Sequence, residues 1–171
     1  RALQLTAHFE GTGFTRVVGN FDGAGLTWGI IGFTLSNGEL GEILSDIASH
    51  HATLFNQAFG SDASVALGKM KLPSAQRVAW GDSISRGPNK MSVAEPWRTY
   101  FDDLGRFPEI QELQVRRARD RYWTIAVRDA TKFALDKERD YAFFYDTAVQ
   151  NGGVTPSRET KIRQRLAASD D

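Results

Sequence analysis

Two acidic residues and a threonine with a spacing suited to hydrolysis lie near the start of the chain. Glu10 precedes Asp22, and Thr27 follows Asp22 after a short glycine-rich segment. A carboxylic acid that protonates a leaving oxygen and a carboxylate that activates water can together hydrolyse a glycosidic bond. A hydroxyl group beside them can hold that water. The three residues are therefore candidates for a general acid, a general base and a water-positioning group.

The segments around these residues predict the local structure that must position them. Residues 14–22 and 26–34 are rich in β-branched and aromatic residues, and Gly23-Ala24-Gly25 lies between them, which predicts a β-hairpin. Residues 1–13 are expected to form a short helix ending in a glycine-rich turn. Glu10 then lies at a helix-to-loop junction beside Phe9, where apolar surroundings would raise its pKa. The same pattern also has a structural interpretation, in which Glu10 caps a turn and Asp22 serves an Asp-Gly turn.

The rest of the chain has the apolar periodicity of helices. From Glu39, apolar residues recur at three- and four-residue spacing and predict one amphipathic helix up to Gly60. Thr155 followed by Pro156 indicates an N-cap and the first position of a last helix. Residues 73–91 are ambiguous, and a loop is favoured over their second half. Further helices are expected at about 62–70, 93–104, from Pro108 past Trp123, 138–150 and 156–167.

The fold class expected from these elements is α+β, mostly α, with a small N-terminal hairpin beside a helical bundle. Residues 1–171 are expected to form one domain, which could belong to a larger protein. The 21 basic and 21 acidic residues give no net charge, which argues against a nucleic-acid partner. No apolar run reaches the length of a membrane span. The absence of cysteine and of metal or nucleotide motifs predicts neither a metal nor an organic cofactor.

Two separated segments carry a resemblance to a known family. The first runs from Glu10-Gly11 through Asp22-Gly23-x-Gly25-x-Thr27-x-Gly29-x-x-Gly32-Phe33. The second comprises Arg119-Asp120-Arg121-Tyr122-Trp123 and the segment from Phe144 to Gly152. Together they resemble the lysozyme superfamily, in particular the chitosanase-like glycoside hydrolases and the phage-type lysozymes. The resemblance implies a lysozyme-like fold and an inverting glycosidase.

The resemblance also implies roles for individual residues. Glu10 is similar to the general acid, Asp22 to the general base and Thr27 to the water-positioning hydroxyl of these enzymes. Asp146 resembles a buried aspartate that forms a charge network with downstream arginines behind the catalytic glutamate. Arg158, Arg163 and Arg165 are the candidates for those arginines.

The substrate is expected to be peptidoglycan, because several features depart from the chitosanase pattern. The interval between Glu10 and Asp22 is nearer that of phage-type lysozymes, and Asn151 stands where chitosanases often have histidine. Chitosan is a polycation, whereas this chain has no acidic excess and many arginines, which suit the carboxylates of peptidoglycan. We therefore expect a muramidase that cleaves the MurNAc–GlcNAc bond. A chitosanase and a non-catalytic glycan-binding module are the alternatives.

Four further residues are candidates for substrate binding, each with a structural alternative. Trp28 and Trp80 could stack on sugars or pack in the core. Arg119 could meet peptide carboxylates or form ion pairs along its helix. His8 could line the cleft or have a structural role. The chain is expected to be a monomer that acts on the cell wall, in the periplasm or outside the cell, with an immunity protein as partner if it is an effector.

Overall fold

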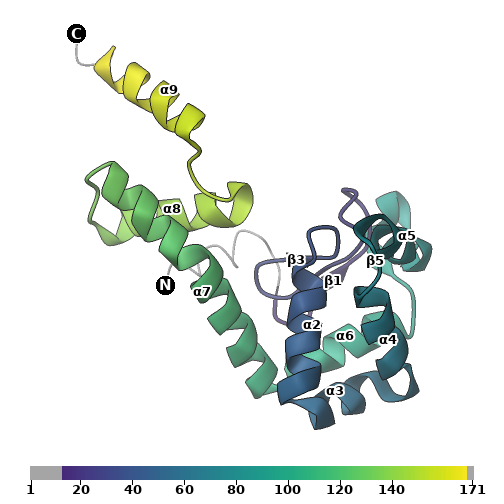
Figure 1. Ribbon diagram of the computed structural model, residues 1–171. Coiled ribbons are helices and arrows are strands. Elements are labelled where there is room, and N and C mark those ends of the chain that lie inside the picture. Colours follow the sequence, from purple (N-terminus) through teal and green to yellow (C-terminus); the bar gives the residue numbers. More distant parts are fainter. Residues whose placement is uncertain (1–12, 169–171) are drawn as a thin grey trace. The chain divides into compact units, whose positions relative to one another are not determined.

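The computed structural model describes residues 13–168 of the chain. The fold is α+β and mostly helical, with small antiparallel sheets, as the sequence predicts (Figure 1). The chain divides into two compact units, whose described parts are residues 13–117 and 118–168. Each unit is described by itself below, and one domain over residues 1–171 stays a prediction.

The predicted hairpin is present in the first unit. Strand β1 (Val17–Val18) pairs antiparallel with β2 (Thr27–Trp28). The second strand-like run, however, does not form one strand, because β2 turns back after two residues and pairs with β3 (Phe33–Thr34). Gly29 and Gly32 have φ angles of +86° and +69° in this turn, a backbone conformation that glycine adopts without steric cost.

The predicted helix from Glu39 to Gly60 is two helices. His51, with φ −132° and ψ 44°, interrupts it, so that α2 ends at His50 and α3 begins at Ala52. Of the ambiguous residues 73–91, the first part is helical and the second part begins a small two-stranded sheet. The elements that complete this unit are α2 (Glu39–His50), α3 (Ala52–Phe59), η1 (Gly60–Asp62), α4 (Ala63–Met70), α5 (Ser74–Ile84), β4 (Ser85–Arg86), η2 (Pro88–Lys90), β5 (Ser92–Val93), α6 (Trp97–Arg106) and the first part of α7 (Pro108–Lys132).

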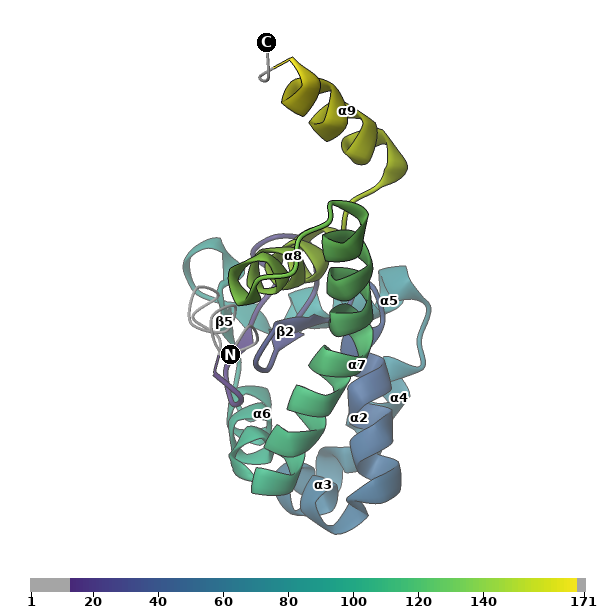
Figure 2. The same ribbon diagram turned by 90° about the vertical axis from the view of Figure 1, so that its left-hand side faces the viewer.

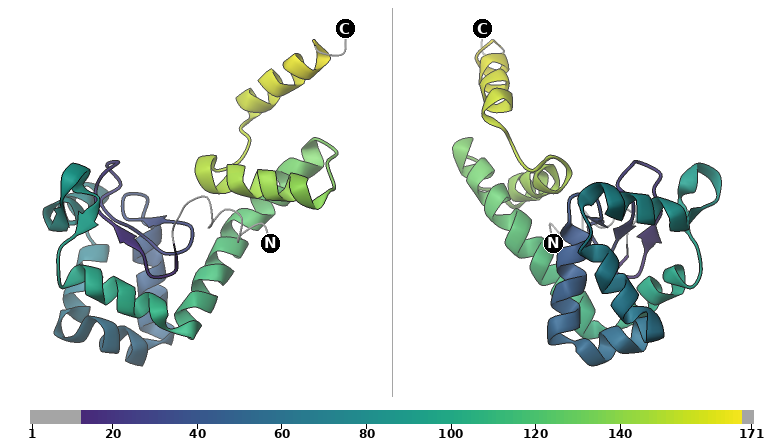
Figure 3. Two further views of the ribbon diagram at one scale, coloured as in Figure 1. Left: turned by 180° about the vertical axis from the view of Figure 1, so that it is seen from behind. Right: turned by 45° about the vertical axis from the view of Figure 1, so that its right-hand side comes forward.

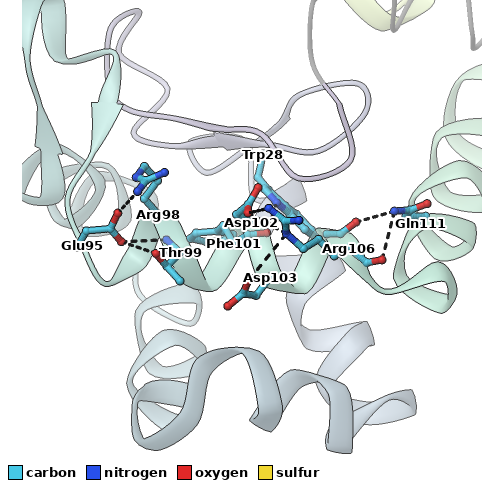
Figure 4. A network of polar contacts seen from close by, with 10 residues as sticks. Trp28, Glu95, Arg98, Thr99, Phe101, Asp102, Asp103, Arg106 and Gln111 are labelled. Carbon is cyan, nitrogen blue, oxygen red and sulfur yellow. Dashed lines mark hydrogen bonds and ion pairs between the residues drawn. The ribbon is translucent and has the colours of Figure 1, made fainter.

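The core of the first unit joins the sheet to the helices. Helix α6 lies between the three-stranded sheet and α3, and α2 packs against both α3 and α4 (Figures 2 and 4). Trp28 is fully buried, and its indole Nε1 donates a hydrogen bond to the carbonyl oxygen of Phe101 at 3.0 Å. The side chains of Phe59 and Phe101 meet edge to face with their ring centroids 5.5 Å apart. The Trp28 and Phe101 ring centroids also lie 5.7 Å apart, so the sheet is attached to α6 by a hydrogen bond and by ring packing, and α6 is packed on α3.

The second unit is a pair of packed helices followed by a third. Helix α8 (Glu138–Asn151) returns beside the last part of α7, and Phe133 stacks on Phe144 at 5.7 Å between centroids (Figure 3). Thr155 caps α9 (Pro156–Ala167), as predicted, by accepting a hydrogen bond from the backbone N–H of Arg158. Helix α9 contains no buried residue. Its contacts with α7 and the residue after it include an ion pair between Glu159 and Lys132, a hydrogen bond from Arg163 to the carbonyl oxygen of Lys132, and the Arg163 guanidinium over the Phe133 ring.

The hairpin and α5 approach each other closely at a pair of glycines. A Cβ atom at Gly81 would lie 2.8 Å from the carbonyl carbon of Gly25 and 3.0 Å from its Cα. Both neighbours are backbone atoms, so a side chain at Gly81 forces α5 and the turn apart. Gly68 in α4 has no atom within 4 Å of the corresponding position. These two helical glycines therefore form a matched pair.

We expect Gly81→Ala to lower the free energy of unfolding by about 1–3 kcal/mol, because it overpacks the contact with Gly25. Gly68→Ala is expected to raise it by roughly 0.5–1 kcal/mol through better helix propensity. Urea unfolding of the two variants and the wild type measures both effects. Equal stability of the two variants would contradict the close approach.

Candidate functional site

Asp22 lies in the turn that follows β1, and its side chain is exposed. Its Oδ1 accepts a hydrogen bond from the backbone N–H of Ala24 at 3.0 Å. This is the turn-forming arrangement that the structural interpretation of Asp22 predicts. One accepted bond leaves most of the acceptor capacity of a carboxylate unused. The geometry is therefore compatible with a second bond to a water molecule.

Thr27 begins the strand that follows the turn, as the sequence predicts. Its neighbour Trp28 points into the core, so Thr27 lies on the opposite face of the strand, where it is half-buried. A Cβ atom at Gly32 would lie 2.9 Å from the Thr27 Cγ2 methyl group. The β2–β3 turn thus restricts this β-branched side chain. Asp22 and Thr27 thus lie on the same hairpin.

Asn20 closes the turn that carries Asp22. Its side-chain Oδ1 accepts a hydrogen bond from the N–H of Gly25 at 2.8 Å, and its Nδ2 donates to Asp82 Oδ1 at 2.7 Å. Its backbone N–H donates to the hydroxyl oxygen of Ser85 at 2.8 Å. Asn20 therefore ties both ends of the turn to α5 and β4. No local sequence pattern marks Asn20 for this role.

Asp82 also forms an ion pair with the ammonium group of Lys90, which lies in the β4–β5 connection. The hydrogen bonds from Lys90 and Asn20 hold the pKa of Asp82 below its usual value, although partial burial opposes this shift. Asp82 therefore stays ionised at neutral pH. Its charge balances that of Lys90 next to the Asp22 turn.

Gln114 fixes the other turn of the sheet from α7. This fully buried side chain accepts a hydrogen bond from the N–H of Ile30 through Oε1 and donates from Nε2 to the carbonyl oxygen of Phe14, both at 3.0 Å. A Cβ atom at Gly29 would lie 2.4 Å from Gln114 Oε1. A signal was available in the sequence, because Gln114 is a polar residue within the apolar row that contains Ile110, Leu113 and Ala118.

Two of the predicted site residues, His8 and Glu10, lie outside the described residues. The structure favours core packing for both tryptophans. Trp28 is fully buried, so no ring face remains for a sugar, and the buried Trp80 meets Trp97 edge to face at 5.1 Å. Arg119 forms an exposed ion pair with Asp120 at 2.8 Å, which is the alternative given for this arginine.

The charge network predicted around Asp146 does not form within residues 13–168. Asp146 is half-buried on α8 and makes no ion pair with the described arginines. Arg163 instead pairs with Glu159, one helical turn before it, at 2.9 Å, and donates to the carbonyl oxygen of Lys132. Arg158 contributes its backbone N–H to the cap at Thr155.

The buried acid of this unit is Asp129 in α7, which is fully inaccessible to solvent. It accepts hydrogen bonds from Arg128 Nε at 2.9 Å and from the N–H of Val154 at 2.7 Å, and Lys132 Nζ lies 3.7 Å away. Burial alone would raise the pKa of Asp129, but these bonds and the two cations hold it below its usual value. A Cβ atom at Gly153 would lie 2.6 Å from Asp129 Oδ2, so only glycine fits there.

No helix within residues 13–168 is long and apolar enough to cross a membrane. The same residues contain no cluster of three or more histidines, aspartates or glutamates suited to a metal ion. Comparison of the chain with protein-family models, curated proteins and solved structures finds no match.

We expect Asp129→Asn to lower the free energy of unfolding by about 1.5–3 kcal/mol at pH 7, the usual value for a hydrogen bond to a charged group. The pKa of Asp129 is lower in the folded state than in the unfolded chain. Its stabilisation is therefore complete above the unfolded value of about 4 and is lost as the pH falls through the folded value. The difference between variant and wild type should shrink at pH 3. Hydrogen exchange of the α8 amides measures this difference in the free energy of unfolding.

Asp120→Asn is the matched control, because Asp120 lies on the same helix in an exposed ion pair. We expect it to change the free energy of unfolding by less than about 1 kcal/mol. If Asp129→Asn were as harmless as Asp120→Asn at pH 7, the proposed importance of the buried carboxylate would be wrong.

Proposed function

We propose that this protein is a peptidoglycan hydrolase that cleaves the β-1,4 bond between MurNAc and GlcNAc. The observation that supports it best is the position of Asp22 and Thr27 on one hairpin that is tied to three helices. The motif around Glu10, which resembles the lysozyme superfamily, supplies the third group. The target lies in the cell wall, so the protein would act in the periplasm or outside the cell.

The proposed reaction is a single displacement. Asp22 accepts a proton from a water molecule while the water oxygen attacks the anomeric carbon, and Thr27 holds that water through its hydroxyl. The glycosidic C–O bond breaks, and Glu10 gives its proton to the leaving oxygen. The products are two shorter glycans. The one that receives the water oxygen has a new reducing end with an inverted anomeric centre. Such a mechanism needs roughly 6.5–9.5 Å between the two carboxyl groups, enough for the water.

The exposure of Asp22 supports the role of a base. A general base must lie within hydrogen-bond reach of the proton that it takes from the attacking water, and Asp22 uses only one accepted hydrogen bond within the turn. Within the described part of the chain, the Thr27 hydroxyl makes no hydrogen bond, so it is available to a ligand. The balance of 21 basic and 21 acidic residues favours an anionic or neutral glycan over polycationic chitosan.

The first test is digestion of purified murein, with mass spectrometry of the reduced products. We expect wild-type protein to create new MurNAc reducing ends. Glu10→Gln and Asp22→Asn are each expected to lower the rate by about 10²–10⁴-fold, the usual contribution of a general acid or base. Asp103→Asn, which changes an exposed carboxylate on α6, is the control and should keep full activity.

Four results would contradict the proposal in different ways. Full activity of Glu10→Gln would remove the assigned acid. GlcNAc reducing ends would identify a glucosaminidase. Product from chitosan but not from murein would select the chitosanase alternative. Binding to cell walls without any product would select a glycan-binding module.

A second test separates the hydroxyl of Thr27 from its shape. Thr27→Val keeps the branched side chain that packs on Gly32 and removes only the hydroxyl. We expect it to lower kcat by roughly 10-fold or more, because the attacking water loses a positioning bond. Thr27→Ser keeps the hydroxyl and should retain most of the activity. Equal kcat in Thr27→Val and wild type would mean that the hydroxyl has no part in the reaction.

A further inference from the structure

The turn that carries Asp22 is closed from inside by one side chain. Asn20 Oδ1 accepts the N–H of Gly25, so the residues at the two ends of the turn are bonded to each other at 2.8 Å. Asp22 lies between them and is bonded to the N–H of Ala24 at 3.0 Å. The position of the Asp22 carboxylate therefore follows the position of Asn20.

Asn20 is itself held from outside the hairpin. Its Nδ2 donates to Asp82 Oδ1 at 2.7 Å, and the same carboxylate oxygen accepts the ammonium of Lys90. Asp82 belongs to α5, and Lys90 belongs to the connection between β4 and β5. The hairpin, α5 and the β4–β5 connection thus meet at one carboxylate oxygen.

The Lys90 segment also packs directly on the hairpin. The N–H of Gly19 donates to the carbonyl oxygen of Met91 at 3.0 Å, and a Cβ atom at Gly19 would lie 2.3 Å from the carbonyl oxygen of Lys90. Lys90 has a φ angle of +56°, which non-glycine residues rarely adopt. Such a conformation persists where the surrounding contacts determine it. The ammonium group is consequently presented to Asp82 from a fixed backbone.

We propose that Asn20, Asp82 and Lys90 are positioning residues that hold the Asp22 carboxylate in place for general-base catalysis. This inference rests on the proposed function. None of the three touches the reacting atoms in this scheme; they act through the turn. A displacement of about 1 Å in a reacting group can cost on the order of 10²-fold in rate. We call Asn20, Asp82 and Lys90 together the clamp. Because the clamp fixes the turn, it would control kcat.

The direct test of the clamp is amide hydrogen exchange at Gly25. Asn20→Ala removes the acceptor of the Gly25 N–H, and we expect exchange at this amide to become at least about 10-fold faster. Asn37→Ala is the matched control. Asn37 also accepts a backbone N–H through its Oδ1, that of Glu39 at 3.1 Å, and among the described residues no hydrogen bond joins its side chain to the Asp22 turn. It should leave exchange at Gly25 unchanged.

The test of positioning is steady-state hydrolysis of murein fragments. We expect Asn20→Ala and Asp82→Asn to lower kcat roughly 10- to 100-fold with little change in KM. Lys90 is exposed, so Lys90→Met is the variant least able to disturb folding. It should lower kcat in the same direction, and Lys90→Arg should restore it by keeping the cation. Asn37→Ala should leave kcat unchanged.

The outcomes separate this inference from the proposed function. If the wild type hydrolyses murein and Asn20→Ala speeds exchange at Gly25 without lowering kcat, the residues only stabilise the hairpin, and positioning is wrong. If exchange at Gly25 is unaltered in Asn20→Ala, the clamp itself is wrong. If the wild type releases no product, the proposed function fails and the positioning role fails with it, whatever the exchange data show about the clamp.

Discussion

The three-stranded sheet cannot form on its own, because each of its strands contains only two residues. So short a ladder leaves most of the nearby backbone groups without strand partners, and buried polar groups need partners. The chain supplies them from helices and from the second small sheet. Asn20 donates to Ser85, Ile30 donates to Gln114, and the indole of Trp28 donates to α6. The geometry of the hairpin is consequently set by its surroundings.

This dependence also accounts for the glycine spacing that led to the glycosidase resemblance. Gly25 lies against α5, and Gly29 lies against Gln114. In each case a Cβ atom on the glycine would be too close to the neighbouring atoms. These glycines are needed for the hairpin to dock, whatever chemistry it performs. The carboxylate and the hydroxyl are therefore the more specific part of the motif. The functional proposal depends on Glu10, Asp22 and Thr27, and the glycines explain how a hairpin could hold two of them rigidly.

Sequence periodicity predicted the helices with a continuous apolar row, such as the one that begins at Pro108, and the cap at Thr155. It missed the break at His51, because the apolar spacing continues across that residue. It missed α5 because only Trp80 and Gly81 of that helix are buried. At the candidate site, the positions of Asp22 and Thr27 on the hairpin could be predicted from a local pattern. Asn20 and Asp82 could not, because their bond joins residues 62 positions apart and leaves no local signal.

The two aspartates of the second unit show how burial selects a charge partner. Asp146 and Asp129 both lie on helices near arginines, and the sequence alone does not distinguish them. A carboxylate can be buried only when its acceptor sites are filled. Asp129 meets this condition because Gly153 lets the N–H of Val154 approach beside Arg128. The pair of glycines that ends α8 thus also creates the site of the buried charge. From there ion pairs continue through Lys132 to Glu159, and they attach a helix that buries none of its own residues.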